Sequence, residues 1–257
     1  MIGPLASLPI HVAGFYGATD RPKIFNYIVS SYTPTLSALL NTKHHSLKPG
    51  HAAHLLTVSQ PATPGHEHLP GTTKEVDAIQ ALQSPASRLC ITRLDDQEAT
   101  VAAVLHHMKE CNWIHLACHG VQDGVNSAFL LIDRPLTLQE IMKQTFSHTE
   151  LAFLSACQTA KGDSKLPGEA IHLAAGMMMA GYRSVVATMW SIQDEDGPIV
   201  AEKFYKYLIE ADGDSSRAAY ALHYAVAHLR EIVGEKFMRW APFIHFGACS
   251  PPTGIMS

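Results

Sequence analysis

The sequence predicts an α/β fold in which a mostly parallel central sheet is covered by helices on both faces. From Thr72 onward, apolar strand patterns alternate with helical patterns, and that alternation is typical of parallel sheets. The chain has 257 residues, of which 47% are hydrophobic, enough to bury one sizeable core. We therefore expect a single domain over residues 1–257.

The first third of the chain predicts two strands, at 26–32 and 54–59, because both are short apolar or β-branched runs bounded by turn residues. Residues 41–71 are otherwise punctuated by Pro-Gly pairs and predict a solvated loop. Six histidines at positions 44, 45, 51, 54, 66 and 68 fall in this region, but their spacing matches no known ligand frame. No metal site is predicted.

The middle of the chain is a regular series of predicted strands and helices. Helical patterns alternate with apolar runs of strand length, which predicts helices at 74–83, 97–110 and 138–144, and strands at 88–93, 113–118, 128–132 and 151–156.

The last third continues with a helix at 168–180, a strand at 184–189 and two further helices before a strand near Phe243. The helix at 197–210 has apolar residues at helical spacing, and the helix at 215–233 follows Asp214, a good N-cap residue. The Met177–Met179 run is expected to pack in the core.

Charge and cysteine usage narrow the possible partners. The net charge is −4 and no basic stripe is present, so neither nucleic acid nor a membrane surface is an expected partner. The N-terminus has no basic region before an apolar run, and no apolar run is long enough to span a membrane. Five cysteines without a C-x-x-C pair suit a reducing compartment, and we expect a cytoplasmic location.

Two predicted strands end on residues that carry chemistry. His119 follows the strand at 113–118, and Cys157 follows the strand at 151–156. Ligand crevices of open α/β sheets lie outside the carboxyl ends of the strands, where an imidazole could activate a thiol. The residues alone leave two interpretations open, a catalytic pair or a buried thiol beside a structural histidine. Cys118 points to the other face of its strand, and packing is expected for it as for Cys90, Cys111 and Cys249.

Many ordered motifs of this sequence resemble the CHAT domain, a caspase-like domain associated with tetratricopeptide repeats. These motifs are Gly3–Gly14, Ser31–Leu36, Leu69–Glu75, His115–Gly120, Leu154–Ala160, Gly168–Ala170, Gly181–Trp190 and Trp240–Phe243. The resemblance implies a caspase-like three-layer α/β/α sandwich. It also implies a cysteine endopeptidase that cleaves a protein or peptide substrate in signalling or regulated cell death, without a cofactor.

The same resemblance implies roles for individual residues. His119 is the general base and acid, Cys157 is the nucleophile, and the backbone N–H groups of Gly120 and Cys157 form an oxyanion hole.

Five further residues are substrate-binding candidates. In metacaspase-like relatives the position two before the cysteine carries an acid, whereas Ser155 here is uncharged, which argues against a simple Arg/Lys-directed pocket. Asp163 and Glu169 follow the cysteine and could supply charge. Trp190 and Ser191 end the next strand and are expected to border the cleft.

The alternative is a catalytically silent CHAT-type interaction module. The family's opening motif begins almost at Met1, so the domain is expected to be N-terminally short and to need cover for one sheet edge. No tetratricopeptide repeat is present in the sequence, and a repeat-containing protein is a possible regulatory partner. A serine hydrolase using Ser155 is disfavoured, because the sequence lacks a G-x-S-x-G elbow there.

Overall fold

A computed structural model describes residues 8–17, 21–42, 52–85, 87–121, 126–155, 157–158 and 170–249. At its centre is a six-stranded sheet with the order β10-β9-β7-β3-β1-β2. All neighbouring strands in it are parallel except the antiparallel pair β9 and β10. The strands are β1 (Ala53–Ser59), β2 (Leu89–Asp95), β3 (Trp113–Ala117), β7 (Leu151–Leu154), β9 (Ser184–Thr188) and β10 (Phe243–Gly247). The predicted mostly parallel sheet is confirmed.

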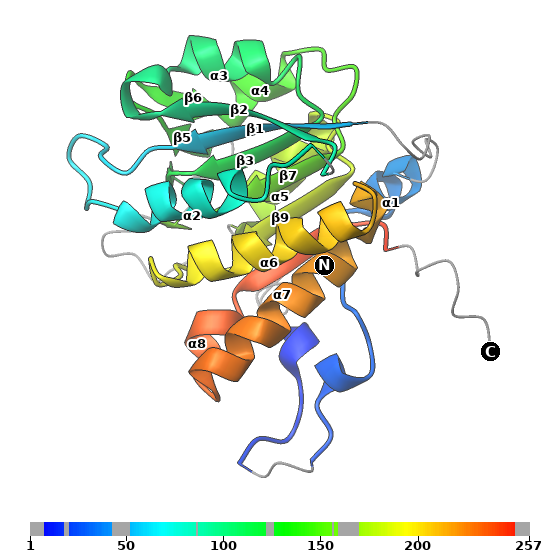
Figure 1. Cartoon of the computed structure of the whole chain (residues 1–257). Coiled ribbons are helices and arrows are strands. Elements are labelled where there is room, and N and C mark those ends of the chain that lie inside the picture. The colour runs from blue at the N-terminus through cyan, green and yellow to red at the C-terminus, as the bar shows by residue number, and fades with distance from the viewer. Residues whose placement is uncertain are drawn as a thin grey trace.

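Helices cover both faces of this sheet and make three layers (Figure 1). On one face lie α3 (Val101–His107), α4 (Leu138–Met142) and α5 (Ala170–Met179). On the other lie α2 (Pro70–Gln80), α6 (Asp196–Glu210), α7 (Ala218–Val233) and the short α8 (Phe237–Trp240). A further helix, α1 (Leu36–Thr42), precedes the sheet, and the 3-10 turns are Ile10–Val12, Ile24–Asn26, Asp96–Glu98 and Ser215–Arg217.

Each face of the sheet has its own apolar core, because side chains of successive strand residues point to opposite faces. Ile114 and Leu116 of β3 pack toward α3 and α5, whereas Trp113 packs toward α6 and α7. Every residue of β3 and β7 is buried. Strands buried on both faces appear in sequence as continuous apolar runs, and this explains why these strands were predictable.

A second, four-stranded sheet lies beyond the ends of β3 and β7, and the sequence did not predict it as a separate unit. Its order is β6-β5-β4-β8, with β4 (His119–Val121), β5 (Ala128–Leu130), β6 (Pro135–Thr137) and β8 (Cys157–Gln158). Strands of two or three residues carry too few side chains to show a periodic pattern.

The strand predicted at 26–32 is wrong. Residues Ile24–Asn26 form a 3-10 turn, and the side chains of Tyr27 and Ile28 are exposed. Only Tyr32 pairs with the sheet, since its N–H donates to the His245 carbonyl and its carbonyl accepts from the Gly247 N–H. This single residue covers part of the outer edge of β10, which would otherwise present unpaired backbone groups.

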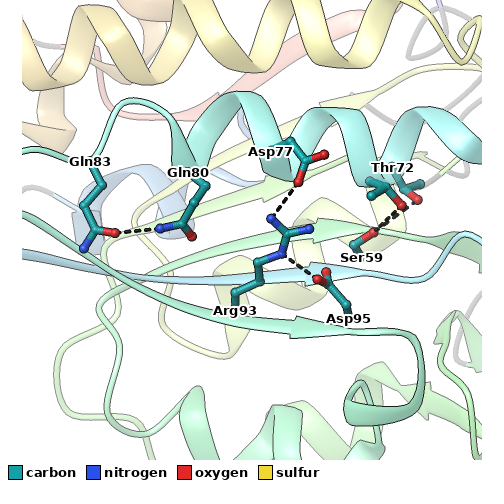
Figure 2. A network of polar contacts seen from close by, with 8 residues as sticks. Ser59, Thr72, Asp77, Gln80, Gln83, Arg93 and Asp95 are labelled. Atoms are coloured by element: carbon teal, nitrogen blue, oxygen red, sulfur yellow. Dashed lines mark hydrogen bonds and ion pairs between the residues drawn. The ribbon is translucent and has the colours of Figure 1, made fainter.

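Helix α2 is fixed to the sheet by polar contacts at its surface (Figure 2). Arg93 of β2 donates to Asp77 of α2 at 2.7 Å and to Asp95 at 2.6 Å. The helix begins at Pro70, four residues before the predicted start, and proline is favoured at a first helical position. The predicted helix at 97–110 is shorter, because Thr100 caps α3 by accepting from the Ala103 N–H.

Packing is confirmed for Cys118 and Cys111, which are buried, but it is wrong for Cys90 and Cys249, which are exposed. Cys90 lies on β2, which is at the edge of the sheet and, among the described strands, pairs with β1 alone. Within the described ranges, no helix combines the length and apolarity needed to cross a bilayer.

One buried and one partly buried histidine make the fold sensitive to acid. His245 lies between the hydroxyls of Ser31 and Ser184, at 2.7 and 2.6 Å, and burial lowers its pKa to about 3. His11 contacts the Tyr32 hydroxyl and the Ala241 carbonyl, and burial lowers its pKa to about 4 against that carbonyl's opposing effect. Both are therefore neutral in the folded protein at pH values where an unfolded histidine takes up a proton.

We expect the free energy of unfolding to fall as the pH drops below about 6.5, by up to roughly 1.4 kcal/mol per pH unit for each histidine. The sign follows because the unfolded chain binds more protons there. Urea denaturation at pH 7, 6 and 5 measures this slope, which should be smaller in His245→Gln. His54→Gln, at an exposed position of β1, is the control. An unchanged slope in His245→Gln would contradict the assignment.

Candidate active site

The two chemically reactive residues predicted from sequence lie side by side at the carboxyl end of the central sheet. Strands β3 and β7 are parallel neighbours, so their carboxyl ends meet at one edge. The chain then continues into β4 and β8, which are also parallel, with His119 opposite Cys157 in register. Adjacent strands lie about 4.8 Å apart. His119 and Cys157 therefore each begin a short strand instead of ending a long one.

The His119 ring is held in one orientation by the backbone. The side chain is 1% exposed, and its Nε2 lies 2.7 Å from the Glu67 carbonyl oxygen. A carbonyl only accepts, so Nε2 carries the proton and donates. The other ring nitrogen, Nδ1, is buried and has no hydrogen-bond partner among the described residues. The imidazole thus keeps a free acceptor nitrogen, as a general base requires.

The loop that supplies this carbonyl, residues 60–69 between β1 and α2, is closed by its own hydrogen bonds. The Leu69 N–H donates to the Pro61 carbonyl at 2.9 Å, and the His66 N–H donates to the Thr63 carbonyl at 3.1 Å. Gln60 anchors the loop to β3 through its N–H and the Ala117 carbonyl. The side chains of the loop's two histidines are exposed, as predicted, but the loop backbone belongs to the site.

The surroundings of His119 favour its neutral form. Burial lowers its pKa, the hydrogen bond to Glu67 opposes that effect, and the nearby His66 ring lowers the pKa further. The two rings lie 5.1 Å apart between centroids. A neutral imidazole at neutral pH is the state that can accept a proton from a thiol.

The backbone of Cys157 forms the first residue of β8. Gly120, the other oxyanion candidate, is buried in β4 and lies opposite Gln158 of β8. The backbones of the two predicted oxyanion residues therefore come from two adjacent strands, one residue out of register with each other.

Ser155, predicted to bind substrate, faces the protein interior. It is 3% exposed, and its hydroxyl donates to Oε2 of Glu75 at 2.9 Å. Glu75, on α2, is itself 2% exposed. A substrate role for Ser155 stays a prediction.

The other substrate-binding candidates are dispersed. Trp190 is partly buried against the α6 and α7 core, and its indole N–H donates to the Met238 carbonyl at 3.1 Å. Ser191 is exposed. Asp163 and Glu169 lie outside the described residues. The cleft contacts of all four stay predictions.

One group of described side chains could hold a metal ion. His106, His107 and Glu110 lie close together at the end of α3. The group is mostly exposed and includes none of the residues around His119.

A comparison with known protein families identifies the family of this chain. A family model of the CHAT domain matches residues 1–248. The chain belongs to the CHAT domain family. No curated protein matches this CHAT domain in a sequence comparison.

Solved structures share the fold of this CHAT domain. An Arg-specific cysteine proteinase, gingipain R, superposes with a TM-score of 0.54 at 12% identity, over 77% of this chain and 46% of that one. A complex of the pro- and mature domains of that proteinase from Porphyromonas gingivalis gives 0.52, at 12% identity, over 78% and 47%. Separase in the Saccharomyces cerevisiae separase–securin complex gives 0.54 at 15% identity, over 82% of this chain and 13% of that one. The predicted caspase-like sandwich is confirmed, and the CHAT domain spans less than half of each of these proteins.

Three residues of the site were not found from the sequence. Glu67 acts through its backbone carbonyl, which leaves no signal in the residue type. His66 was noted only as one of several loop histidines. Glu75 was noted within the motif Leu69–Glu75, but nothing in the sequence pairs it with a residue 80 positions later.

The ring of His119 should titrate below the ordinary histidine pKa of about 6.5 and carry its neutral-state proton on Nε2. In His66→Ala the pKa of His119 should rise, because a neighbouring like charge is removed and solvent gains access. Nitrogen NMR of the imidazoles measures both, with the spectrum of His119→Gln as the assignment control. A proton on Nδ1, or a pKa above 6.5 in the wild type, would contradict this geometry.

Proposed function

We propose that this CHAT domain is a cysteine endopeptidase that cleaves a protein substrate with His119 and Cys157 as its dyad. One observation carries the proposal. His119 is in register with Cys157, with its Nε2–H committed to Glu67 and its buried Nδ1 left without a partner among the described residues. This is the arrangement that a general base beside a thiol needs.

The proposed reaction has two halves. Nδ1 of His119 takes the proton of the Cys157 thiol, and the sulfur attacks the carbonyl carbon of the scissile bond. The imidazolium then gives that proton to the leaving amine as the C–N bond breaks, which leaves an acyl-enzyme thioester. In the second half His119 takes a proton from water, the hydroxide oxygen attacks the thioester, and the sulfur leaves and recovers its proton.

The negative oxygen formed in each half needs donors that are already in place. We propose that these donors are the backbone N–H groups of Gly120 and Cys157, which lie on the paired strands β4 and β8. Loss of one such donor typically lowers the rate on the order of 10²- to 10³-fold.

The proposed substrate is a protein, which contacts Trp190, Ser191, Asp163 and Glu169. Separase is bound to securin and mature gingipain to its pro-domain in the matched structures, and this supports a protein as partner or regulator. A repeat-containing regulatory protein is the proposed regulator. The two buried cysteines among the described residues, Cys111 and Cys118, form no disulfide, which suits a reducing location, and we propose the cytoplasm and a role in signalling or regulated cell death.

The proposal predicts that digestion of a peptide library depends on both dyad residues. Cys157→Ala should abolish cleavage because no sulfur remains to form the acyl-enzyme. His119→Ala should lower kcat/KM on the order of 10²- to 10⁴-fold because the general acid and base is lost. Cleavage products are identified by mass spectrometry.

Cys90→Ser is the matched control, since Cys90 is an exposed free cysteine on an edge strand. It should cleave like the wild type. Equal cleavage by the wild type and Cys157→Ala would reject the dyad. Absence of cleavage by the wild type, together with slow alkylation of Cys157, would favour the silent interaction module.

A further inference from the structure

A buried carboxylate contacts both chain segments that lead to the proposed dyad. Glu75 of α2 accepts the hydroxyl of Ser155 at Oε2, 2.9 Å away. Its other oxygen, Oε1, lies 3.1 Å from Nε2 of His115 on β3, a close polar contact without the geometry of a hydrogen bond. All three side chains are at most 3% exposed.

The place of these partners in the chain is specific. Ser155 comes two residues before Cys157 and His115 comes four residues before His119. One carboxylate therefore links the segments that carry the two dyad residues. The helix that bears Glu75 also follows the loop whose Glu67 carbonyl holds the His119 ring.

His115 and Glu75 are packed against α6 and β7 as well. Nδ1 of His115 lies 3.2 Å from the hydroxyl of Tyr205 on α6, and burial raises the pKa of that hydroxyl well above its usual value, so it stays protonated and can donate. The His115 ring stacks on Phe153 of β7 at 4.8 Å between centroids. At Gly197, on the first turn of α6, an added Cβ would come within 2.7 Å of Oε2 of Glu75.

Stability alone is a poor reason for this cluster. A buried ionisable group loses its hydration, and apolar residues of the same volume often serve the fold equally well. The surrounding layer of Phe153, Phe204 and Tyr205 is aromatic and well packed. The carboxylate adds what an apolar group lacks: it accepts a hydrogen bond from Ser155 and makes a close polar contact with His115, and together these set the distance between two strand ends.

We propose that Glu75 is a positioning residue, which sets the spacing of Cys157 against His119 through Ser155 and His115. This role rests on the proposed peptidase function. Displacement of a reacting group by about 1 Å can cost on the order of 10²-fold in rate, so the contact need not touch substrate to matter.

The first part of the test compares four variants of the full chain with the wild type. Ser155→Ala removes the link to the Cys157 segment, and Glu75→Leu removes both links at similar volume. Glu75→Gln keeps an acceptor for Ser155 and a polar contact for His115. Asp77→Asn, on the same helix but directed at Arg93, is the matched control (Figure 2).

We expect kcat to fall about 10- to 100-fold in Ser155→Ala and Glu75→Leu with KM within about twofold, because ground-state binding of the substrate is unchanged. Glu75→Gln should stay within about threefold of the wild type, and Asp77→Asn should match it. The pH midpoint of Cys157 alkylation by iodoacetamide, mapped by mass spectrometry, should rise in the first two variants as the imidazole moves away from the sulfur.

The double variant Ser155→Ala/Glu75→Leu separates positioning from folding. In Glu75→Leu the buried Ser155 hydroxyl loses its acceptor, which lowers stability. The double variant also removes that hydroxyl, so its Tm should recover toward the wild-type value. If positioning is the role, its kcat stays low although its Tm recovers. Gly197→Ala, which pushes on the carboxylate without removing a polar group, should lower kcat in the same direction.

The outcomes are distinct. Recovery of kcat together with Tm in the double variant would overturn the positioning role. An active wild type matched by Ser155→Ala and Glu75→Leu would also overturn it and leave the peptidase function standing. Failure of the wild type to cleave peptides, with Cys157 alkylated no faster than Cys90, would overturn the peptidase function itself.

Discussion

The register between β3 and β7 is the constraint on which the rest of the site depends. The parallel pairing brings both strand ends to the same edge, and the continuation into β4 and β8 keeps His119 opposite Cys157. A slip of one residue would turn every side chain to the other face of the sheet. Since both strands are buried on both faces, the apolar cores on either side oppose such a slip. The position of the proposed dyad is therefore a consequence of how the core packs.

The segment from β1 to α2 then adds the polar part of the site. Its loop holds the His119 ring through Glu67, and its helix brings Glu75 into contact with Ser155 and His115. This double role requires a rigidly seated helix. At the start of α2 the Gly71 N–H donates to Asp194 at 2.6 Å, and an added Cβ at Gly71 would lie 2.1 Å from the Asp194 backbone oxygen. This close contact between Gly71 and Asp194 fixes α2 against the segment that leads into α6. The contacts of Arg93 fix α2 against β2.

Features that depend on a continuous or periodic pattern of apolar side chains could be predicted from the sequence. Buried strands such as β3 and β7 are continuous apolar runs, and the helices show apolar spacing, so the parallel sheet and its layers were predictable. The two reactive residues were found because each follows such a run. Pairing by a single backbone group, as at Tyr32, and short strands such as β4 and β8 leave no periodic signal. The contact between Glu75 and Ser155 joins residues 80 positions apart, and no local pattern encodes it.

The chemistry of this chain must be argued from its own groups, because the matched solved structures share its fold at only 12 to 15% identity. The decisive group is the acceptor that holds His119. A backbone carbonyl fixes the ring's tautomer as a carboxylate would, but it carries no full charge and so stabilises an imidazolium less. Burial and the neighbouring His66 ring act in the same direction and lower the pKa of His119. In the proposed peptidase the ring therefore rests neutral until it takes the proton of the thiol, and a base of that kind is most effective once a substrate has excluded water from the site.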